Sequence, residues 1–245
     1  MRLAFTLLDW QASAPGLGEL SAWQQWAAQP AAVDATGPLT KCDQLPMMAA
    51  RRLNSGSRMA VNNGLALLRR QPDIEAIVFT SRHGELERNL RILLALSKQE
   101  SLSPTDFAMS VHNSAVGSLT IAAQAPLVST SISAGMDSFQ QGLVEVAALQ
   151  SAGYSRVLLV DFDGAIPEFY HSLVAGQMPC YPYAVALLLA PGATLTCETR
   201  SMAGGASEPA LPQSLQFLHS WLSCTPTFAV DGERQRWQWT TVHHV

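Results

Sequence analysis

The sequence predicts an α/β fold in which a mixed, mainly parallel sheet carries helices on both faces. Two observations support this prediction. Apolar runs such as 157–162 (VLLVDF) and 183–189 (YAVALLL) alternate with longer segments of helical periodicity, and strands without polar alternation are typical of parallel sheets covered on both sides. No linker, internal repeat or low-complexity tract interrupts the 245 residues. We therefore expect a single domain over residues 1–245.

The expected strands are short apolar runs bounded by turn-forming residues. Residues 3–8 form the first, and Asp9 ends this run too early for the apolar core of a signal peptide. Further strands are expected at 74–80, 126–130, 157–162 and 183–189. The segment 195–200 is expected to pair with 183–189 across Pro191-Gly192. Residues 234–242 alternate like an edge strand, with Trp237 and Trp239 on one face.

Apolar residues at helical spacing predict the segments between the strands. Helices are expected near 20–28 and over 47–70, 85–96, 111–123, 134–152 and 215–222. Arg69-Arg70 and Pro72 end the second of these, and Gly153 is placed to cap the fifth. Ser103-Pro104 indicates a turn, and residues 203–212 are expected to form a loop.

Charge and hydropathy exclude several classes of protein. Charged residues make up 14% of the chain, against about 25% in typical soluble domains. Hydrophobic residues make up 48%, which excludes a disordered chain. The net charge of −4 gives no basic footprint for nucleic acid, and no apolar run of about 18 residues predicts a membrane span. The low charge instead suggests an apolar surface that faces a partner.

Lysines and cysteines narrow the chemistry further. Neither Lys41 nor Lys98 lies in a GxxxxGK[ST] motif, so a P-loop is excluded. The cysteines have no zinc-binding spacing; they are Cys42, Cys180, Cys197 and Cys224. Scattered thiols are typical of a reducing compartment, so we expect a cytoplasmic protein without a metal or redox cofactor. His243-His244 is expected to be a solvated tail.

One constellation suggests a hydrolase. Residues 131–135 (SISAG) imitate the G-x-S-x-G nucleophile elbow of α/β-hydrolases, with Ser133 as the nucleophile. Asp163 and His219 follow in the chain order of a catalytic triad. However, Ser131 occupies the position of the first glycine. The alternative interpretation is a serine-rich helix start that Ser133 caps.

A second constellation is the strand ending in Asp161-Phe162-Asp163-Gly164. It resembles the nucleophile loop of haloacid-dehalogenase phosphatases, in which the first aspartate attacks and the second acts as the acid. Ala165 stands where that loop needs Thr or Val, and no lysine follows Lys98. The alternative is a strand that ends in a polar turn.

Three successive segments carry a more specific resemblance. Residues 110–121 (SVHNSAVGSLTI) place a glycine four positions after Asn113, in a helix that ends in Leu-Thr-Ile. Residues 129–139 (STSISAGMDSF) are similar to the motif S-T-A-C-A-S-G-x-x-A-I, and residues 153–160 resemble the helix end and strand that follow it. The order and spacing of these segments resemble the β-ketoacyl synthases, whose two halves each have a thiolase-like fold.

The departures from that pattern bear on activity. With Thr130 and Gly135 aligned, the nucleophilic cysteine position is occupied by Ile132. A thiolate accepts the acyl chain in this chemistry, and isoleucine cannot do so. The resemblance also implies two catalytic histidines in a second thiolase half. No histidine here has a matching context, so residues 1–245 are expected to be a ketosynthase-like N-terminal domain without that half and without condensing activity.

A ketosynthase-like chain without its cysteine resembles a chain length factor, which pairs with an active ketosynthase and shapes its acyl tunnel. The short form is similar to the ketosynthase-like proteins of bacterial aryl polyene biosynthesis. The resemblance implies a heterodimer with an active ketosynthase and transient contact with acyl carrier protein, docked mainly on the active subunit. It implies no cofactor, nucleic acid or membrane.

The resemblance also implies site residues. The dimer interface would use the strand before the nucleophile position and the start of the preceding helix: Pro126, Leu127, Val128, Ser129, Thr130, His112 and Asn113. The acyl tunnel or its gate would use Ser81, Arg82, Leu86, Leu90, Phe107 and Ile132. Side-chain size would set product length there, since one methylene too many in a filled apolar pocket costs about 1–3 kcal/mol.

Two other classes of function stay open. A serine hydrolase would be labelled by a fluorophosphonate probe, and Ser133→Ala would abolish the labelling. A homodimeric thiolase-fold scaffold without an acyl role would form a stable homodimer and ignore any ketosynthase.

Overall fold

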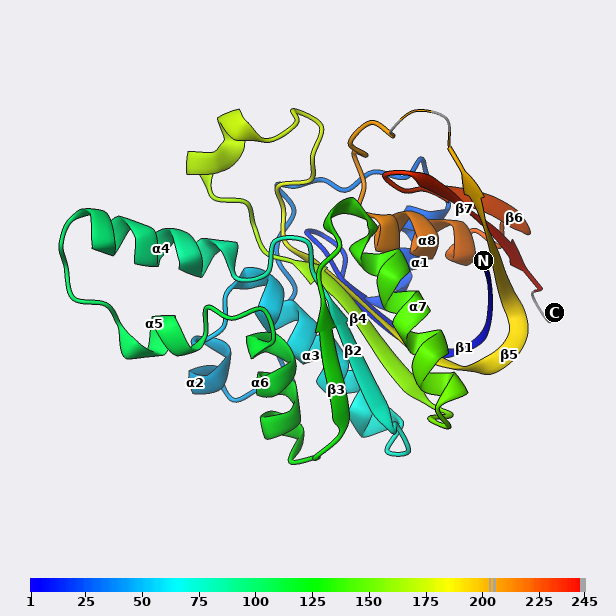
Figure 1. Cartoon of the computed structure of the whole chain (residues 1–245), viewed down its shortest axis with the longest axis horizontal. Helices are drawn as coiled ribbons and strands as arrows, with labels where there is room; N and C mark the ends of the chain where they lie inside the picture. The colour runs from blue at the N-terminus through cyan, green and yellow to red at the C-terminus, as the bar shows by residue number, and fades with distance from the viewer. Residues whose placement is uncertain (203, 205, 243–245) are drawn as a thin grey trace.

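The computed structural model describes residues 1–202, 204 and 206–242. Its described strands form one seven-stranded sheet in the order β3-β2-β4-β5-β7-β6, and β1 also pairs with β5 (Figure 1). The strands are β1 (Arg2–Ser13), β2 (Ala76–Thr80), β3 (Val128–Ile132), β4 (Val157–Asp163), β5 (Tyr183–Ser201), β6 (Thr227–Asp231) and β7 (Gln235–Thr241).

Helices cover both faces of this sheet. The α-helices are α1 (Leu20–Ala27), α2 (Met47–Ala50), α3 (Ser55–Arg70), α4 (Leu86–Ser97), α5 (Pro104–Ala108), α6 (Ser114–Ala123), α7 (Ser138–Ser151) and α8 (Gln213–Leu222). Two 3₁₀-helices are η1 (Gly135–Asp137) and η2 (Glu168–Leu173). Buried residues of α3 and α6 form one apolar cluster with the sheet, and those of α1, α7 and α8 form another.

The predicted mixed sheet with helices on both faces is confirmed, but its parallel part is smaller than expected. β2 pairs in parallel with β3 and with β4. The other pairs are antiparallel: β4 with β5, β1 with β5, β5 with β7, and β6 with β7. Parallel strands need crossover helices, and α7 provides one of them between β3 and β4.

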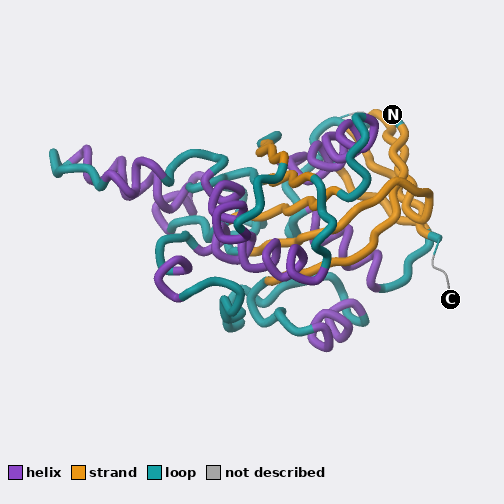
Figure 2. Tube along the Cα trace, turned by 90° about the horizontal axis from the view of Figure 1, so that it is seen from below, coloured by secondary structure: helices purple, strands orange, loops and turns teal. Residues whose placement is uncertain are grey.

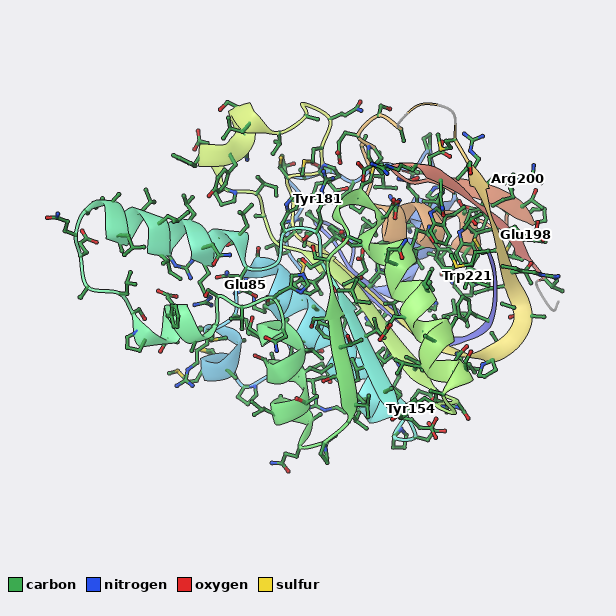
Figure 3. The ribbon with its side chains drawn as sticks, viewed as in Figure 1. Glu85, Tyr154, Tyr181, Glu198, Arg200 and Trp221 are labelled. Atoms are coloured by element: carbon green, nitrogen blue, oxygen red, sulfur yellow. The ribbon has the colours of Figure 1, made fainter. Side chains whose placement is uncertain are left out.

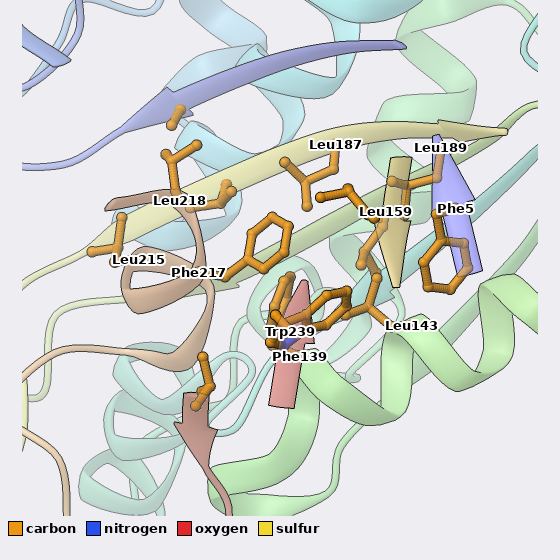
Figure 4. Close-up of a cluster of buried hydrophobic side chains, with 14 of the residues drawn as sticks. Phe5, Phe139, Leu143, Leu159, Leu187, Leu189, Leu215, Phe217, Leu218 and Trp239 are labelled. Carbon is orange, nitrogen blue, oxygen red and sulfur yellow. The ribbon is translucent and has the colours of Figure 1, made fainter. Parts of the chain in front are cut away.

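One part of the core lies where apolar strand residues meet α7 and α8. Figure 4 shows Phe139 and Leu143 of α7 beside Phe217 and Trp239. The rings of Phe217 and Trp239 lie 4.9 Å apart at 69°, an arrangement that favours aromatic contacts. Trp237 and Trp239 are both fully buried, as the predicted alternation requires.

Two strand predictions were wrong. Residues 183–189 and 195–200 do not form a hairpin but belong to the single strand β5. The antiparallel neighbour β1 runs along both parts, and the register jumps from Ala190–Thr6 to Leu195–Phe5, so the Pro191-Gly192 segment is a bulge rather than a turn. The segment 234–242 is not an edge strand, because β7 pairs with β6 as well as with β5.

Two helix predictions and one turn prediction need correction. The expected helix 47–70 is divided into α2 and α3. Asn54, which immediately precedes α3, has an extended backbone that interrupts the helix. The expected helix 134–152 begins only at Ser138, after η1, and Gly135 has a positive φ of 59° that an α-helix cannot contain. Ser103-Pro104 starts the short helix α5, where the Ser103 hydroxyl accepts the Asp106 N–H. The loop prediction at residues 203 and 205 and the prediction for His243-His244 lie outside the described residues.

The pair α4 and α5 projects from the body of the molecule as an arm, as both views show (Figures 1 and 2). Its base is anchored by Arg88, which is buried and pairs with Glu85 and Asp106. Glu85 accepts a hydrogen bond from Asn54 at 2.7 Å and another from Ser57. The arm is therefore tied to the start of α3. In the described part of the chain, no helix is long and apolar enough to cross a membrane.

Candidate functional site

The end of β3 is joined to the turn that follows β2. Ile132 is the last residue of β3 and is half-buried. Its carbonyl oxygen accepts the Ser81 N–H at 3.2 Å. The next residue, Ser133, is exposed and donates its hydroxyl to the Arg82 carbonyl oxygen at 3.4 Å. The position expected for a nucleophile therefore carries a hydrocarbon side chain held beside this turn.

The turn at residues 81–84 is built around the carboxylate of Asp163, the last residue of β4. Asp163 accepts hydrogen bonds from the Ser81 hydroxyl at 2.6 Å, the His83 N–H at 2.8 Å and the Arg82 N–H at 3.4 Å. The Gly84 N–H in turn donates to the Ser81 oxygen at 2.8 Å. Gly84 has a φ of +55°, which closes the turn.

Asp161 lies two residues earlier on β4, and the strand period places it on the same face as Asp163. Its carboxyl group accepts hydrogen bonds from the Thr80 hydroxyl and the Ser214 hydroxyl, each at 2.6 Å. The Tyr183 hydroxyl lies 3.3 Å away. Burial raises the pKa of Asp161 to about 7, although these hydrogen bonds act in the opposite direction.

A cavity of about 40 Å³ lies beside these carboxyl groups. Its walls include Arg82, His83, Tyr183 and Glu208. Arg82 closes one side through a two-bond ion pair with Glu208, at 2.5 and 3.1 Å. Burial lowers the pKa of His83, and nearby Asp163 only partly offsets this effect. Figure 3 labels Tyr181 in the same region, just before β5. The cavity has room for water molecules but not for an acyl chain.

The predicted tunnel residues divide into two groups. Ser81, Arg82 and Ile132 come together at the joined ends of β2 and β3, and Ser81 is fully buried. Leu86 and Leu90 are half-buried on α4, one turn apart. Phe107 is 67% exposed on α5, the other helix of the arm. Their roles as tunnel or gate residues stay a prediction.

The predicted interface residues lie along an open side of the sheet. β3 is the outermost strand beside β2, and among the described residues no strand pairs with its outer edge. Val128 is 46% exposed there. The His112 ring contacts the Ser81 carbonyl oxygen at 3.1 Å, and exposed Asn113 precedes α6 without capping it through its side chain. Other exposed apolar side chains lie on α4, α5 and α6 and on the segment before α6: Leu93, Leu94, Leu96, Phe107, Ile121 and Val111.

The geometry does not support a Ser133 hydrolase. His219 lies on α8, where its ring nitrogen contacts the Gln29 carbonyl oxygen at 2.8 Å and its ring packs on Trp26. Asp163 instead binds the 81–84 turn. Ser133 does not cap α7, which begins five residues later. Ser133, His219 and Asp163 therefore each have a different hydrogen-bonding partner and do not form a triad.

The combination of several polar residues is not evident from the sequence. Asp161 and Asp163 are interpreted there as a phosphatase-like pair, with Asp163 also a candidate for the hydrolase triad, and Thr80, Tyr183 and Ser214 are not among the candidates. A usable signal was present, since β2 and β4 both end in hydroxyl or carboxyl residues. The carboxyl ends of parallel strands meet at one edge of a sheet. In the described part of the chain, no group of three or more His, Cys, Asp or Glu residues is arranged to hold a metal ion.

Comparison with known proteins identifies the family. The family model "Beta-ketoacyl synthase, N-terminal domain" matches residues 23–240. The chain therefore belongs to the β-ketoacyl synthase N-terminal-domain family, and its fold is thiolase-like, as predicted. A comparison with curated proteins found no significant match.

Solved structures agree. A chain from the complex of the ketosynthase ApeO with its chain length factor ApeC, from Xenorhabdus doucetiae, is 58% identical with a TM-score of 0.94. The match covers 97% of this chain and 99% of that one. A chain of the ishigamide ketosynthase/chain length factor has 13% identity and a TM-score of 0.75, covering 98% and 100%. A β-ketoacyl synthase from Burkholderia phymatum STM815 has 13% identity and a TM-score of 0.57, covering 91% and 71%. The last two show a common fold.

Proposed function

We propose that this chain is a non-catalytic chain length factor that pairs with an active β-ketoacyl synthase and shapes its acyl tunnel. Aryl polyene or a related polyketide synthesis is the pathway class that fits the short ketosynthase-like form. Residues 1–245 would act as a single ketosynthase-like domain, and the continuous sheet supports this. The likeness to a chain of the ApeO–ApeC complex supports a ketosynthase as the partner.

The observation that carries the proposal is Ile132 at the end of β3. The β3–η1–α7 junction has the position expected for the ketosynthase nucleophile, yet the side chain there has no group that can attack a thioester. The adjacent Ser133 hydroxyl donates a hydrogen bond to the backbone carbonyl oxygen of Arg82. A chain with this junction can line a tunnel with hydrocarbon but cannot hold an acyl group covalently there.

The open edge of β3 supports the partner role. An unpaired strand edge is a template for pairing with another chain, and proteins usually cover or charge it. Here the described edge is neither covered nor charged, and Val128 exposes an apolar side chain beside Ser129. We propose that the equivalent strand of the ketosynthase pairs with it. His112, Asn113 and residues 126–130, which include the first part of β3, would then lie in the interface.

Acyl carrier protein is proposed as a transient partner that docks mainly on the active ketosynthase. This chain adds a basic groove of about 500 Å³ between the start of α3 and the arm. Arg51, Arg52 and Arg58 line it and have no ion-pair partner among the described residues. Guanidinium groups match carboxylates and phosphates, so the groove suits an acidic protein surface.

The deciding experiment is co-expression with the ketosynthase encoded beside this chain, followed by size-exclusion chromatography with mass measurement. We expect a 1:1 complex, and a ketosynthase that loses solubility or activity when this chain is omitted. A monomer that ignores the ketosynthase would overturn the proposal. A stable homodimer that also ignores it would favour the scaffold without an acyl role.

A further inference from the structure

Two carboxyl groups at the end of β4 lie on either side of a single phenol. The Tyr183 hydroxyl is 3.3 Å from Oδ2 of Asp161 and 3.3 Å from Oδ2 of Asp163. A phenol carries one proton, so it can donate to only one of these groups at a time. The charge on Asp161 therefore affects whether Asp163 receives the hydrogen bond from Tyr183.

Asp161 has two states with different hydrogen-bonding needs. Burial raises its pKa to about 7, so the carboxyl group is protonated below neutral pH. In that state the Tyr183 proton is free for Asp163. When Asp161 ionises, it competes for the same phenol proton and repels the neighbouring carboxylate. The two hydroxyl donors Thr80 and Ser214 are present in both states.

Asp163 is the acceptor on which the 81–84 turn is built. Its carboxylate accepts one side-chain and two backbone hydrogen bonds from Ser81, Arg82 and His83. The adjacent cavity lies between this turn and the start of α8, and Arg82 reaches across it to Glu208, so apolar packing from that side is incomplete. The hydrogen bonds to Asp163 therefore do much to fix the turn.

We propose that the Asp161–Tyr183–Asp163 network positions the 81–84 turn, and that ionisation of Asp161 loosens it. Asp163 is then a positioning residue. The consequence for product length rests on the proposed function, because the turn carries Ser81 and Arg82, which we place at the tunnel gate. A looser gate would broaden the range of chain lengths made by the complex.

Other titratable or charged groups near the network come from the turn, from the segment before β5 and from the loop before α8. They are His83, Arg82, Tyr181 and Glu208. Burial lowers the pKa of His83, which keeps its ring neutral at pH 7 and above. Burial also raises the pKa values of Tyr181 and Tyr183, so neither phenol ionises near neutrality.

Amide hydrogen exchange of the full chain tests the proposal directly. Protection factors at pH 6 and pH 8, each referenced to the intrinsic rate at that pH, are compared for Arg82, His83 and Gly84. We expect these amides to lose about tenfold in protection, since the protonated fraction of a group with a pKa near 7 falls about tenfold over that range. Amides in the buried strand β4 should keep their protection.

Three variants separate the network from general stability. Asp161→Asn mimics the protonated carboxyl and should remove the pH dependence, whereas Tyr183→Phe should lower protection of the turn at pH 6. Asp231→Asn, which removes a surface ion pair with Arg236, should behave as the wild type does at this turn.

Two results would overturn the proposal: equal protection of the wild-type turn at both pH values, or an unchanged pH dependence in Asp161→Asn. If Asp161→Asn does not fold, the wild-type comparison and Tyr183→Phe still decide. Chromatography with the ketosynthase measures pairing independently, so failure of this inference and failure of the proposed function give different results. For the complex, the range of product lengths at pH 6 and pH 8 is the functional measurement.

Discussion

The backbone N–H of Ser81 donates to the carbonyl oxygen of Ile132 at 3.2 Å, which joins the turn after β2 to the last residue of β3. Two residues 51 positions apart in the sequence thus become neighbours at the open side of the sheet. Ile132 occupies the position that we propose corresponds to the ketosynthase nucleophile, and Ser81 belongs to the turn that Asp163 holds. The turn is therefore in direct contact with the proposed tunnel wall.

Replacing Val128 by arginine should prevent pairing with the ketosynthase. The exposed side chain lies on the edge of β3, and burying an unpaired charge in an interface costs more than about 3 kcal/mol, or over 100-fold in affinity. Size-exclusion chromatography of the co-expressed pair measures this. Leu20→Arg is the matched control, since Leu20 is 59% exposed on α1, and its complex should be unaffected. Equal complex formation by both variants would refute the placement of the interface.

Substitutions at Leu86 and Leu90 should change the length of the product. Phenylalanine at either position should shorten it and alanine should lengthen it, because an apolar tunnel discriminates added carbons by about 1–3 kcal/mol per methylene. Mass spectrometry of the products of the reconstituted complex gives the distribution. Leu96→Ala serves as the control, because Leu96 is exposed on another side of α4. Unchanged lengths for all variants would remove these two residues from the tunnel.

Ile132→Cys should not restore condensing activity to this chain alone. The thiol would supply a nucleophile, but the proposed loss of both catalytic histidines leaves no group for the decarboxylation step. Alkylation with iodoacetamide, followed by mass spectrometry, checks that the new thiol is accessible. A condensation assay with an acyl donor and malonyl-loaded acyl carrier protein should then give no product. Formation of a β-ketoacyl product would contradict the non-catalytic assignment.

The stability of the chain should depend on pH through Asp161. Its pKa is raised from 3.8 to about 7 in the folded state, so the folded state binds the proton more tightly than the unfolded state. The resulting stabilisation is fully present below pH 4 and is lost as pH rises from about 4 to about 7, by at most about 4 kcal/mol.

Asp161→Asn should remove this slope, so that the variant gains on the wild type as pH rises from 5 to 8. Urea denaturation at fixed pH intervals measures the difference in the free energy of unfolding. Asp231→Asn gives the opposite sign, since hydrogen bonding to Arg236 lowers the pKa of Asp231 and that contribution is lost as pH falls. Parallel curves for the wild type and Asp161→Asn would show that the pKa of Asp161 is the same in the folded and unfolded states, which would contradict the prediction.

Local sequence determined the elements with strong patterns. The run Val157–Val160 has no polar residue, and all four side chains are fully buried in β4. Arg69-Arg70 ends α3 as expected, and the proposal that Ile132 occupies the nucleophile position comes from the sequence without any structure. These features depend on neighbouring residues, so periodicity and motif spacing were sufficient to predict them.

Tertiary structure alone decided what depends on distant partners. Pro191-Gly192 has the composition of a turn, but antiparallel pairing with β1 along both parts of β5 holds that segment as a bulge. Thr80, Asp161, Tyr183 and Ser214 come from four elements and meet only when β2, β4, β5 and α8 pack together. Burial then changes the proton affinity of Asp161. The pattern of the chain thus set most of its strands and helices and placed an isoleucine at position 132, whereas packing in a low-dielectric core created the carboxyl network beside the proposed gate.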